Sequence, residues 1–314
     1  MKTVYDFVII GAGPAGISLG VEAKEKKQNT LILEKGSGHL TTIRDFYKDG
    51  KRVDKDWKGS SVNLKGNVDF FDGTKETTID FFQKLILDYN LDIRYGKEVE
   101  SAKKVGENFR VVTTSGDIFL AKKVVISIGN MGRPNKPSYL IPPKVRKVVD
   151  FNLDKYQKGE KILVVGGGNS ASEYAYDIAK DCETTLTYRK NKFTRVNPEN
   201  IVNMNRAVKE NNLKLKLGID IDHISAIDNG VRVHFNHREF NDFDRIIFAI
   251  GGVVPTDFLK KCGVTFDKEK KIILDSSFET EIKNLYIIGD LALSSGGSIA
   301  VAINHAFELM TKFK

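Results

Sequence analysis

A strand, a glycine-rich turn and a helix are encoded twice in this chain, and this repeat limits the fold more than any other feature. The first copy reads FVIIGAGPAGISLG over residues 7–20, and the second reads KILVVGGGNSASEYA over residues 161–175. In each copy an apolar strand leads into closely spaced glycines and then a helical segment. The free backbone N–H groups of such a helix start can bind the pyrophosphate of a dinucleotide. We therefore expect two dinucleotide-binding units.

An acidic residue gives the first copy its specificity. The segment TLILEK reads as a second strand that ends at Glu34. Glu34 follows Gly11 by the roughly 20 residues that separate the loop from the ribose-binding carboxylate in dinucleotide folds. A carboxylate there accepts both hydroxyls of the adenosine ribose and repels a 2′-phosphate. The first copy thus favours FAD or NAD over NADP.

The same place in the second copy carries the opposite charge. The strand TTLTYRK ends at Arg189, with Lys190, Lys192 and Arg195 close behind, and Ala171 replaces the third glycine. An arginine beside the adenosine ribose accommodates a 2′-phosphate. The alternative is a solvated basic loop, which would be the usual interpretation of a basic run without this register. The second copy predicts an NADPH site.

Both copies continue into an alternating β-meander and an apolar strand ending in Ile-Gly, at Gly129 and Gly251. The tail then predicts a strand ending at Gly289-Asp290, a glycine-serine loop and a helix from near Ser298. Asp290 can accept a hydrogen bond from the ribityl chain of a flavin, and the helix start can place N–H groups near the N1–C2=O edge of the ring. The alternative is an ordinary strand, turn and helix.

We predict an α/β fold of two tandem, Rossmann-like, three-layer ββα domains. The FAD domain comprises residues 1–130 and 254–314, and the NADPH domain, residues 131–253, is inserted into it. The prolines after Gly129 and the segment GGVVP predict the two linkers. Five basic residues and no acidic one lie between Arg133 and Lys147, which predicts a positively charged crossing between the domains.

Composition narrows the class of protein. The chain has 314 residues, of which 41% are hydrophobic and 29% charged, as in a globular protein. No apolar run approaches the ~20 residues of a membrane span, and no signal peptide precedes the first strand, so we expect a cytoplasmic protein without an integral membrane segment. The net charge of +8 comes with no nucleic-acid motif. It indicates a surface for an acidic protein partner instead.

The motif order resembles the low-molecular-weight thioredoxin reductase family over the full length of the chain. The motifs are GAGPAG, Glu34, Gly129, GGGNSA, Arg189-Lys190, Gly251 and Gly289-Asp290. This resemblance implies FAD in the domain built from both chain ends, NADPH in the inserted domain, a hinge, and a homodimer.

The chain departs from that family in its cysteines. Thioredoxin reductases carry a Cys-x-x-Cys shortly before the second glycine loop, whereas residues 145–163 contain no cysteine here. The related bacillithiol disulfide reductases are reported to use a cysteine in the first glycine loop, where this chain has Ala15. Disulfide reduction through a dithiol needs an attacking and a resolving thiol. Cys182 and Cys262 are the only cysteines, and they are far apart in the sequence.

We therefore expect electrons to leave through the flavin itself. The group that the sequence most resembles is the thioredoxin-reductase-like ferredoxin or flavodoxin:NADP reductases, in particular the flavodoxin:quinone reductases. The resemblance implies flavodoxin, ferredoxin or a quinone as acceptor, and a basic surface suits an acidic carrier. The chain ends directly after its last helix, so we expect no extension over the ring. Disulfide reduction, a non-catalytic flavin sensor and a flavin monooxygenase remain as alternatives.

The candidate site residues fall into two sets. For FAD they are Gly11, Gly13, Pro14, Ala15, Gly16, Glu34, Lys35, Val99, Gly129, Gly289, Asp290 and Ile299. For NADPH they are Gly166, Gly168, Asn169, Ser170, Ala171, Arg189, Lys190 and Arg195. No side chain is assigned a catalytic role, because flavin N5 accepts the hydride, and no metal site is expected. Aromatic residues that could stack on the flavin are Phe46, Tyr47, Trp57, Phe70 and Phe71, although a core or loop role is the more ordinary interpretation of each.

Overall fold

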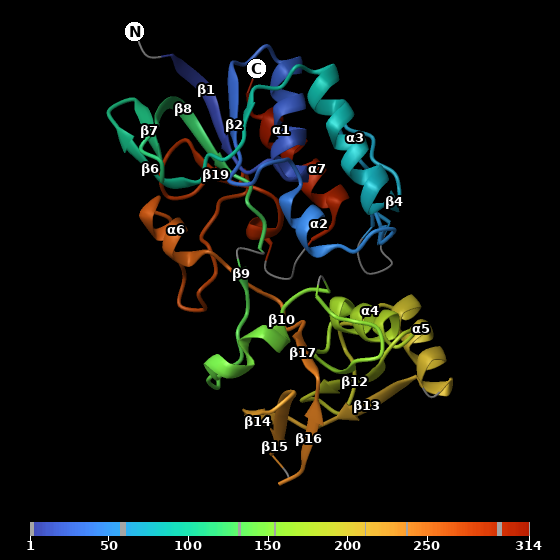
Figure 1. Ribbon diagram of the computed structural model, residues 1–314. Helices are drawn as coiled ribbons and strands as arrows, with labels where there is room; N and C mark the ends of the chain where they lie inside the picture. Colours follow the sequence, from blue (N-terminus) through green and yellow to red (C-terminus); the bar gives the residue numbers. More distant parts are fainter. Residues whose placement is uncertain are drawn as a thin grey trace. The chain divides into compact units, whose positions relative to one another are not determined.

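The protein is described by a computed structural model that covers residues 3–56, 61–130, 133–153, 155–210, 212–236, 238–293 and 297–313. It divides into two compact units (Figure 1). Unit 1 combines Met1–Gly132 with Val254–Lys314, and unit 2 is Arg133–Val253. Each has its own sheets and hydrophobic cores, as expected of domains that fold around separate interiors.

The main sheet of unit 1 has seven strands in the order β5-β2-β1-β8-β7-β6, with β19 also paired to β8. Their bounds are β1 Val4–Ile10, β2 Thr30–Leu33, β5 Ile93–Arg94, β6 Val99–Val105, β7 Asn108–Thr113, β8 Ile118–Ile126 and β19 Leu285–Ile287. β1 is parallel to β2 and β8, whereas β6, β7 and β8 form an antiparallel meander. β8 therefore pairs antiparallel with β7 along its first half and parallel with β19 along its second.

Helices cover one face of this sheet, where α1 packs on both α3 and α7 (Figure 1). The remaining elements of unit 1 are α1 Pro14–Glu25, α2 Thr41–Phe46, β3 Arg52–Val53, β4 Gly73–Thr74, α3 Lys75–Asp88, α6 Thr256–Lys261, the 3₁₀ helix η2 Gly289–Ala292 and α7 Ile299–Thr311. β1 shows that both faces of this sheet are buried. Phe7 and Ile9 join the core under the helices, and Val8 and Ile10 join the core on the other face. A strand covered on both faces reads as a continuous apolar run.

Unit 2 repeats this three-layer plan. A parallel sheet in the order β10-β17-β11-β12-β13 has helices α4 and α5 on one face and the antiparallel meander β14-β15-β16 on the other. The bounds are β9 Arg133–Pro134, η1 Pro143–Val148, β10 Val149–Asp150, β11 Lys161–Val165, α4 Asn169–Ile178, β12 Glu183–Tyr188, α5 Pro198–Lys209, β13 Leu213–Leu217, β14 Ile221–Ile227, β15 Gly230–Phe235, β16 Phe240–Phe243, β17 Arg245–Phe248 and β18 Gly252–Val253. The predicted α/β fold of two Rossmann-like units is confirmed.

Five predicted strand ends were wrong. β8 ends at Ile126 and β17 at Phe248, before the Ile-Gly pairs. Likewise β2 ends at Leu33 and β12 at Tyr188, one residue before Glu34 and Arg189. β19 ends at Ile287, and Gly289-Asp290 begins the 3₁₀ helix η2.

The proline-rich segment after Gly129 is not a free linker. β9 pairs with β18 inside unit 2, and Val145 of η1 is only 1% exposed in a core of that unit. The basic residues of this segment therefore belong to unit 2, which begins at Arg133. Val145, just after the last prolines, is buried, and Tyr139 and Ile141 pack partly against the same core, which outweighs the tendency of proline to mark linkers.

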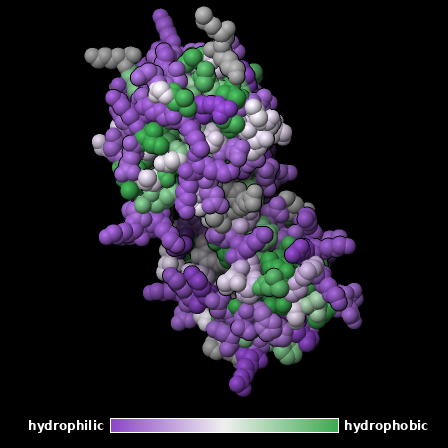
Figure 2. Space-filling model, turned by 90° about the vertical axis from the view of Figure 1, so that its left-hand side faces the viewer, coloured by the Kyte–Doolittle hydropathy of each residue, from purple (hydrophilic) through white to green (hydrophobic). Residues whose placement is uncertain are grey.

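The face drawn in Figure 2 is mainly hydrophilic, and its hydrophobic side chains form separate patches. Within the described residues, no helix is long and apolar enough to cross a membrane.

Candidate cofactor-binding sites

The first glycine loop is shaped by close backbone contacts. Gly11 has φ +105°, and a Cβ there would lie 2.9 Å from the Ser127 carbonyl oxygen. A Cβ on Gly16 would overlap the Gly11 carbonyl oxygen. Gly13 differs, because the nearest atom to its Cβ position is 3.8 Å away. Two glycines thus fold the loop tightly, and the third leaves an open side from which a phosphate could approach the backbone.

The start of α1 offers unpaired donors at this open side. Gly13 is the N-cap residue and Pro14 follows at the first helical position, and within the described chain no side chain caps this end. The N–H groups of the first turn have no acceptor in the helix itself. The amides of Ala15 and Gly16 are therefore available to an anion, and the helix dipole adds positive potential.

Glu34 lies directly beside the loop and is 6% exposed. Its Oε2 accepts the N–H of Ala12 at 2.8 Å, and its Oε1 accepts the N–H of Gly36 at 2.8 Å and the Thr41 hydroxyl at 3.1 Å. These donors hold the carboxylate against the turn while lone pairs remain for ribose hydroxyls. Thr41 was not predicted, since nothing local in the sequence ties it to Glu34. Lys35 is exposed, whereas the Val99 side chain lies in the core at 7% exposure.

The C-terminal segment brings a second set of groups to unit 1. Gly289 has φ +75°, and a Cβ there would stand 3.2 Å from the Ala15 Cβ, so this turn passes close to the first glycine loop. Burial raises the pKa of the next residue, Asp290, although a hydrogen bond from the Gly297 amide partly opposes this rise. The Asn130 side-chain amide, directly after Gly129, donates to the Asp290 carbonyl at 3.0 Å. Asn130 is a further residue that the sequence pattern missed.

The start of α7 is only partly free. The Ser298 hydroxyl accepts the Val301 N–H at 3.2 Å, and the Ala300 N–H donates to the Lys55 carbonyl at 3.4 Å. Of the first three helical residues this leaves Ile299, and the contact of its N–H with a flavin ring stays a prediction.

The second glycine loop has the same construction in unit 2. A Cβ on Gly166 would overlap the Ala249 carbonyl oxygen, whereas nothing lies within 4 Å of the Cβ position of Gly168. Gly168 caps α4, and among the described residues no side chain caps this helix start. Ala171, at the position of Gly16, has its side chain fully buried. This loop therefore tolerates a methyl group where the first loop does not.

The segment after β12 brings one of the predicted basic residues, Arg195, beside this loop. Arg195 forms a parallel β-bridge with Gly168, and the Asn197 N–H donates to Oδ1 of Asn169 at 2.7 Å. The segment after β12 thus folds back onto the helix start. The side chains that were predicted to meet a nucleotide are exposed here, namely Asn169, Ser170, Arg189, Lys190 and Arg195. Tyr188, which was not predicted, packs its ring against Gly167 and stacks on Phe193 at 5.6 Å.

The aromatic residues that could stack on the flavin differ in how deeply they are buried. Phe70 is 2% exposed in the core, and Phe71 beside it is 69% exposed. Phe46 ends helix α2 rather than lying in a loop, and Tyr47 packs against the core with the Lys51 ammonium 3.9 Å from its ring centre. Trp57 lies outside the described residues.

Both cysteines are buried in hydrophobic cores, one in each unit. Cys262 is 1% exposed, and burial raises its pKa to about 11. Cys182 is 7% exposed, its pKa is also raised by burial, and its thiol donates to the Gln157 carbonyl at 3.2 Å. Thiolates are the reactive form, so neither environment favours redox chemistry. In the described chain no group of three or more His, Cys, Asp or Glu could hold a metal ion.

Comparison with known proteins identifies the family. The sequence pattern of the pyridine nucleotide-disulphide oxidoreductases matches residues 8–289. The chain belongs to this family. It is 24% identical over 308 residues to bacilliredoxin reductase Bdr of Bacillus subtilis, covering 93% of this chain and 91% of that protein. It is 26% identical over 296 residues to a ferredoxin–NADP reductase of Ignicoccus hospitalis, covering 91% and 90%.

Solved structures agree on the fold. Bacillithiol disulfide reductase Bdr of Staphylococcus aureus superposes with a TM-score of 0.85 at 21% identity, over 99% of this chain and 98% of that one. A thioredoxin reductase of Lactococcus lactis gives 0.77 at 20% identity, over 98% and 97%. The protein is thus an oxidoreductase, a flavoprotein of thioredoxin reductase type whose cofactors are FAD and NADPH. The two open, uncapped helix starts fit two dinucleotides.

Proposed function

We propose that this reductase passes electrons from NADPH through FAD directly to flavodoxin, ferredoxin or a quinone, without a redox-active disulfide. The observation that supports this most is the burial of Cys182 and Cys262 in the cores of different units, together with Ala15 in the first glycine loop. When bound, FAD supplies the chemistry that links a two-electron hydride donor to acceptors that take one electron at a time.

In this proposal unit 1 holds FAD. The amides of Ala15 and Gly16 bind the pyrophosphate, and Glu34 accepts the ribose hydroxyls. Asp290 accepts a hydroxyl of the ribityl chain, and Ile299 directs its N–H toward the N1–C2=O edge, where negative charge develops on reduction. Gly129 and Gly289, which follow the ends of β8 and β19, carry no side chain at this position.

Unit 2 holds NADPH in the same proposal. The start of α4, with Gly168, Asn169 and Ser170, binds the pyrophosphate. Arg189 and Lys190 bind the 2′-phosphate, and the β-bridge between Arg195 and Gly168 brings a third positive charge to the phosphates.

Disulfide reduction is the second candidate, because two of the similar proteins are named Bdr. It requires a thiol that can reach the flavin and be oxidised. Ala15 is 4% exposed and carries no sulfur, and burial raises the pKa of both cysteines. These observations favour direct electron transfer.

The deciding experiment is rapid-mixing oxidation of the NADPH-reduced protein by flavodoxin, ferredoxin, a quinone and bacillithiol disulfide in parallel. We expect fast oxidation by at least one of the first three and none by the disulfide. The variant Cys182→Ala/Cys262→Ala should give the same traces. Fast oxidation by the disulfide that disappears in the double variant would overturn the proposal, and slow oxidation by every acceptor would favour a flavin sensor.

A further inference from the structure

One histidine of α7 makes an unusual contact with the turn that precedes Asp290. His305 is 8% exposed, and its Nδ1 accepts the backbone N–H of Gly289 at 3.2 Å. The last strand-to-strand bond of this segment is from the Ile288 N–H to the Ile126 carbonyl, at 3.1 Å. Gly289 is therefore the first amide beyond the sheet. In place of a main-chain partner it has an imidazole nitrogen.

This contact fixes the proton on the ring. A backbone N–H can only donate, so Nδ1 must carry a lone pair and the imidazole proton must sit on Nε2. Protonation at Nδ1 would point two donors at one another. Burial lowers the pKa of His305 below its ordinary value of 6.5, and Glu308, one turn further along α7, opposes this only in part. The group that faces the ring from the 275–280 loop is the uncharged ring of Phe278, and from η2 it is the Gly289 amide.

Phe278 holds the imidazole in place at a conformational cost. Its ring lies 4.5 Å from that of His305 between centres, with a 37° tilt. Phe278 has φ +65°, a left-handed conformation that is rare and unfavourable for a bulky residue. Its carbonyl accepts the Ile287 N–H at 2.9 Å, which ties it to β19.

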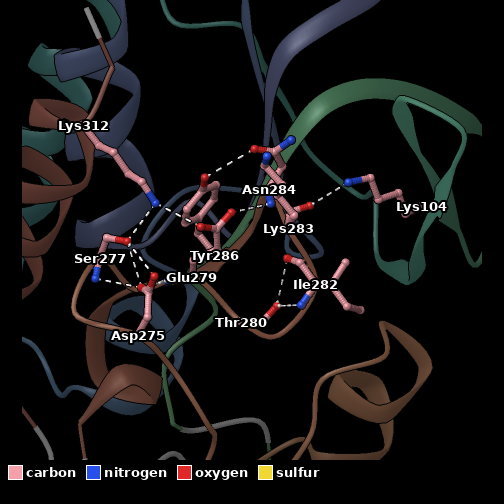
Figure 3. Close-up of polar contacts among 10 residues, drawn as sticks. All are labelled: Lys104, Asp275, Ser277, Glu279, Thr280, Ile282, Lys283, Asn284, Tyr286 and Lys312. Carbon is pink, nitrogen blue, oxygen red and sulfur yellow. Dashed lines mark hydrogen bonds and ion pairs between the residues drawn. The ribbon is translucent and has the colours of Figure 1, made fainter.

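A polar network stabilises this strained turn (Figure 3). Asp275 Oδ1 accepts the N–H and hydroxyl of Ser277 at 2.8 Å each and the Glu279 N–H at 2.9 Å. From the end of α7, the Lys312 ammonium contacts the Ser277 hydroxyl at 2.8 Å and the Glu279 carboxylate at 3.0 Å. The turn that carries Phe278 is thus bound to the same helix that carries His305.

We propose that His305 is a positioning residue of the flavin site, which presents an unprotonated Nδ1 to Gly289 and thereby holds Gly289-Asp290 in the orientation that FAD binding requires. The inference rests on the proposed assignment of FAD to unit 1. Its consequence is a flavin site that loosens as the pH falls. The contact is complete at neutral pH and is lost as the pH drops through the lowered pKa of His305.

The test follows FAD release from the purified holoenzyme by the fluorescence of free FAD across a pH series. Wild type should release FAD slowly at pH 7 and faster in acid. His305→Leu retains an apolar side chain against Phe278 but leaves the Gly289 N–H unpaired, so we expect release about tenfold faster at pH 7. His305→Asn offers Oδ1, which accepts the same N–H and does not titrate. It should match wild type at pH 7 and show no acceleration in acid.

Two further measurements separate positioning from general stability. ¹⁵N NMR of the imidazole should show Nδ1 without a proton at pH 7, and hydrogen exchange of the Gly289 amide should quicken in His305→Leu. His234→Asn, which alters a half-buried histidine of the β14-β15-β16 sheet in unit 2, is the matched control and should leave the acid acceleration intact.

The inference is overturned if His305→Leu releases FAD at the wild-type rate, or if His305→Asn retains the acid acceleration. If His305→Leu does not fold, the pH profile of His305→Asn decides alone. A wild-type protein that holds no FAD would instead contradict the proposed function, because the assignment of FAD to unit 1 would then fail.

Discussion

The two glycine loops share one construction but differ in exposure. In unit 1 the loop and its acid are interior, with Ala15 and Glu34 at 4% and 6% exposure, and Glu34 has three protein donors. In unit 2 the corresponding Arg189 is exposed, as are its neighbours Lys190 and Lys192. An interior, preorganised site suits a cofactor that stays bound, whereas an open, charged site suits one that must exchange in each turnover. The difference supports FAD in unit 1 and NADPH in unit 2.

The third position of each loop, Gly16 in unit 1 and Ala171 in unit 2, should give the largest difference between the two sites. A methyl group on Gly16 would overlap the Gly11 carbonyl oxygen, whereas Ala171 already carries one in the second loop. We expect Gly16→Ala to lose bound flavin and about 3 kcal/mol of unfolding free energy. Ala171→Gly should cost about 1 kcal/mol and retain nucleotide binding. Flavin absorbance per protein and denaturant unfolding measure both. Full flavin content in Gly16→Ala would show that the loop is not as tight as described.

The charge at the ribose position is the next test. Removing both side chains in Arg189→Ala/Lys190→Ala deletes two charge-assisted contacts to a 2′-phosphate, so KM for NADPH should rise about 30-fold while KM for NADH barely changes. Steady-state reduction of a small dye acceptor measures both constants. Lys209→Ala, an exposed lysine on α5, is the control. An unchanged preference between the two nucleotides would refute the assignment of Arg189.

Charge reversal on a basic surface of unit 2 should have a smaller effect, on KM for the carrier. We define this surface, the basic strip, as Lys136, Lys144, Arg146 and Lys147. All four side chains are exposed, and Leu140 among them is 79% exposed. If the carrier is acidic, Lys144→Glu/Arg146→Glu/Lys147→Glu should raise its KM several-fold at low salt, and added salt should shrink the difference.

The control for the strip replaces three exposed lysines elsewhere by glutamate, in Lys103→Glu/Lys209→Glu/Lys268→Glu. This variant changes the net charge by the same amount as the triple variant of the strip. KM for NADPH with the dye acceptor should stay constant in both triple variants. Equal losses in the two would mean that net charge alone, and not the strip, steers the carrier.

The cysteines give the smallest expected effect. With a pKa of about 11, Cys262 is about one part in a thousand thiolate at pH 8, and Cys182 is likewise buried with a raised pKa. The thiolate fraction grows only as the pH rises toward these values. We therefore expect no thiol labelling of the native protein within minutes at pH 8, before or after NADPH, and two labelled thiols after unfolding. Rapid labelling of either one after NADPH addition would reopen disulfide reduction.

The sequence was a good guide where local chemistry dictates structure. The glycines at 11, 13, 166 and 168 need their backbone freedom or their open sides, and Glu34 and Arg189 follow the strands at the expected register. Strand ends were less predictable. The pairing of β8 stops where β1 ends and the glycine loop begins. There the Ser127 hydroxyl donates to the Ile10 and Gly11 carbonyls. An apolar run cannot show where its partner ends.

Contacts between distant segments could not be predicted. The role of the proline-rich segment depends on Val145 finding a core, and the Gly289–His305 bond depends on α7 returning beside β19. Neither has a local signal, because proline and histidine have many ordinary uses. The positive φ of Phe278 is equally invisible, since only its surroundings hold it there.

The split pairing of β8 also bears on how the chain matures during synthesis. β8 can pair with β1 and β7 early, but its third partner, β19, emerges from the ribosome only after all of unit 2. Unit 2 can therefore finish folding while unit 1 still exposes an unpaired strand edge and an uncovered core. Long-range closure of this kind is slow and leaves apolar surface open to aggregation. Asp290 and α7 are synthesised last, so binding of FAD to them would be the final step of folding. The supply of flavin would then determine the yield of folded protein.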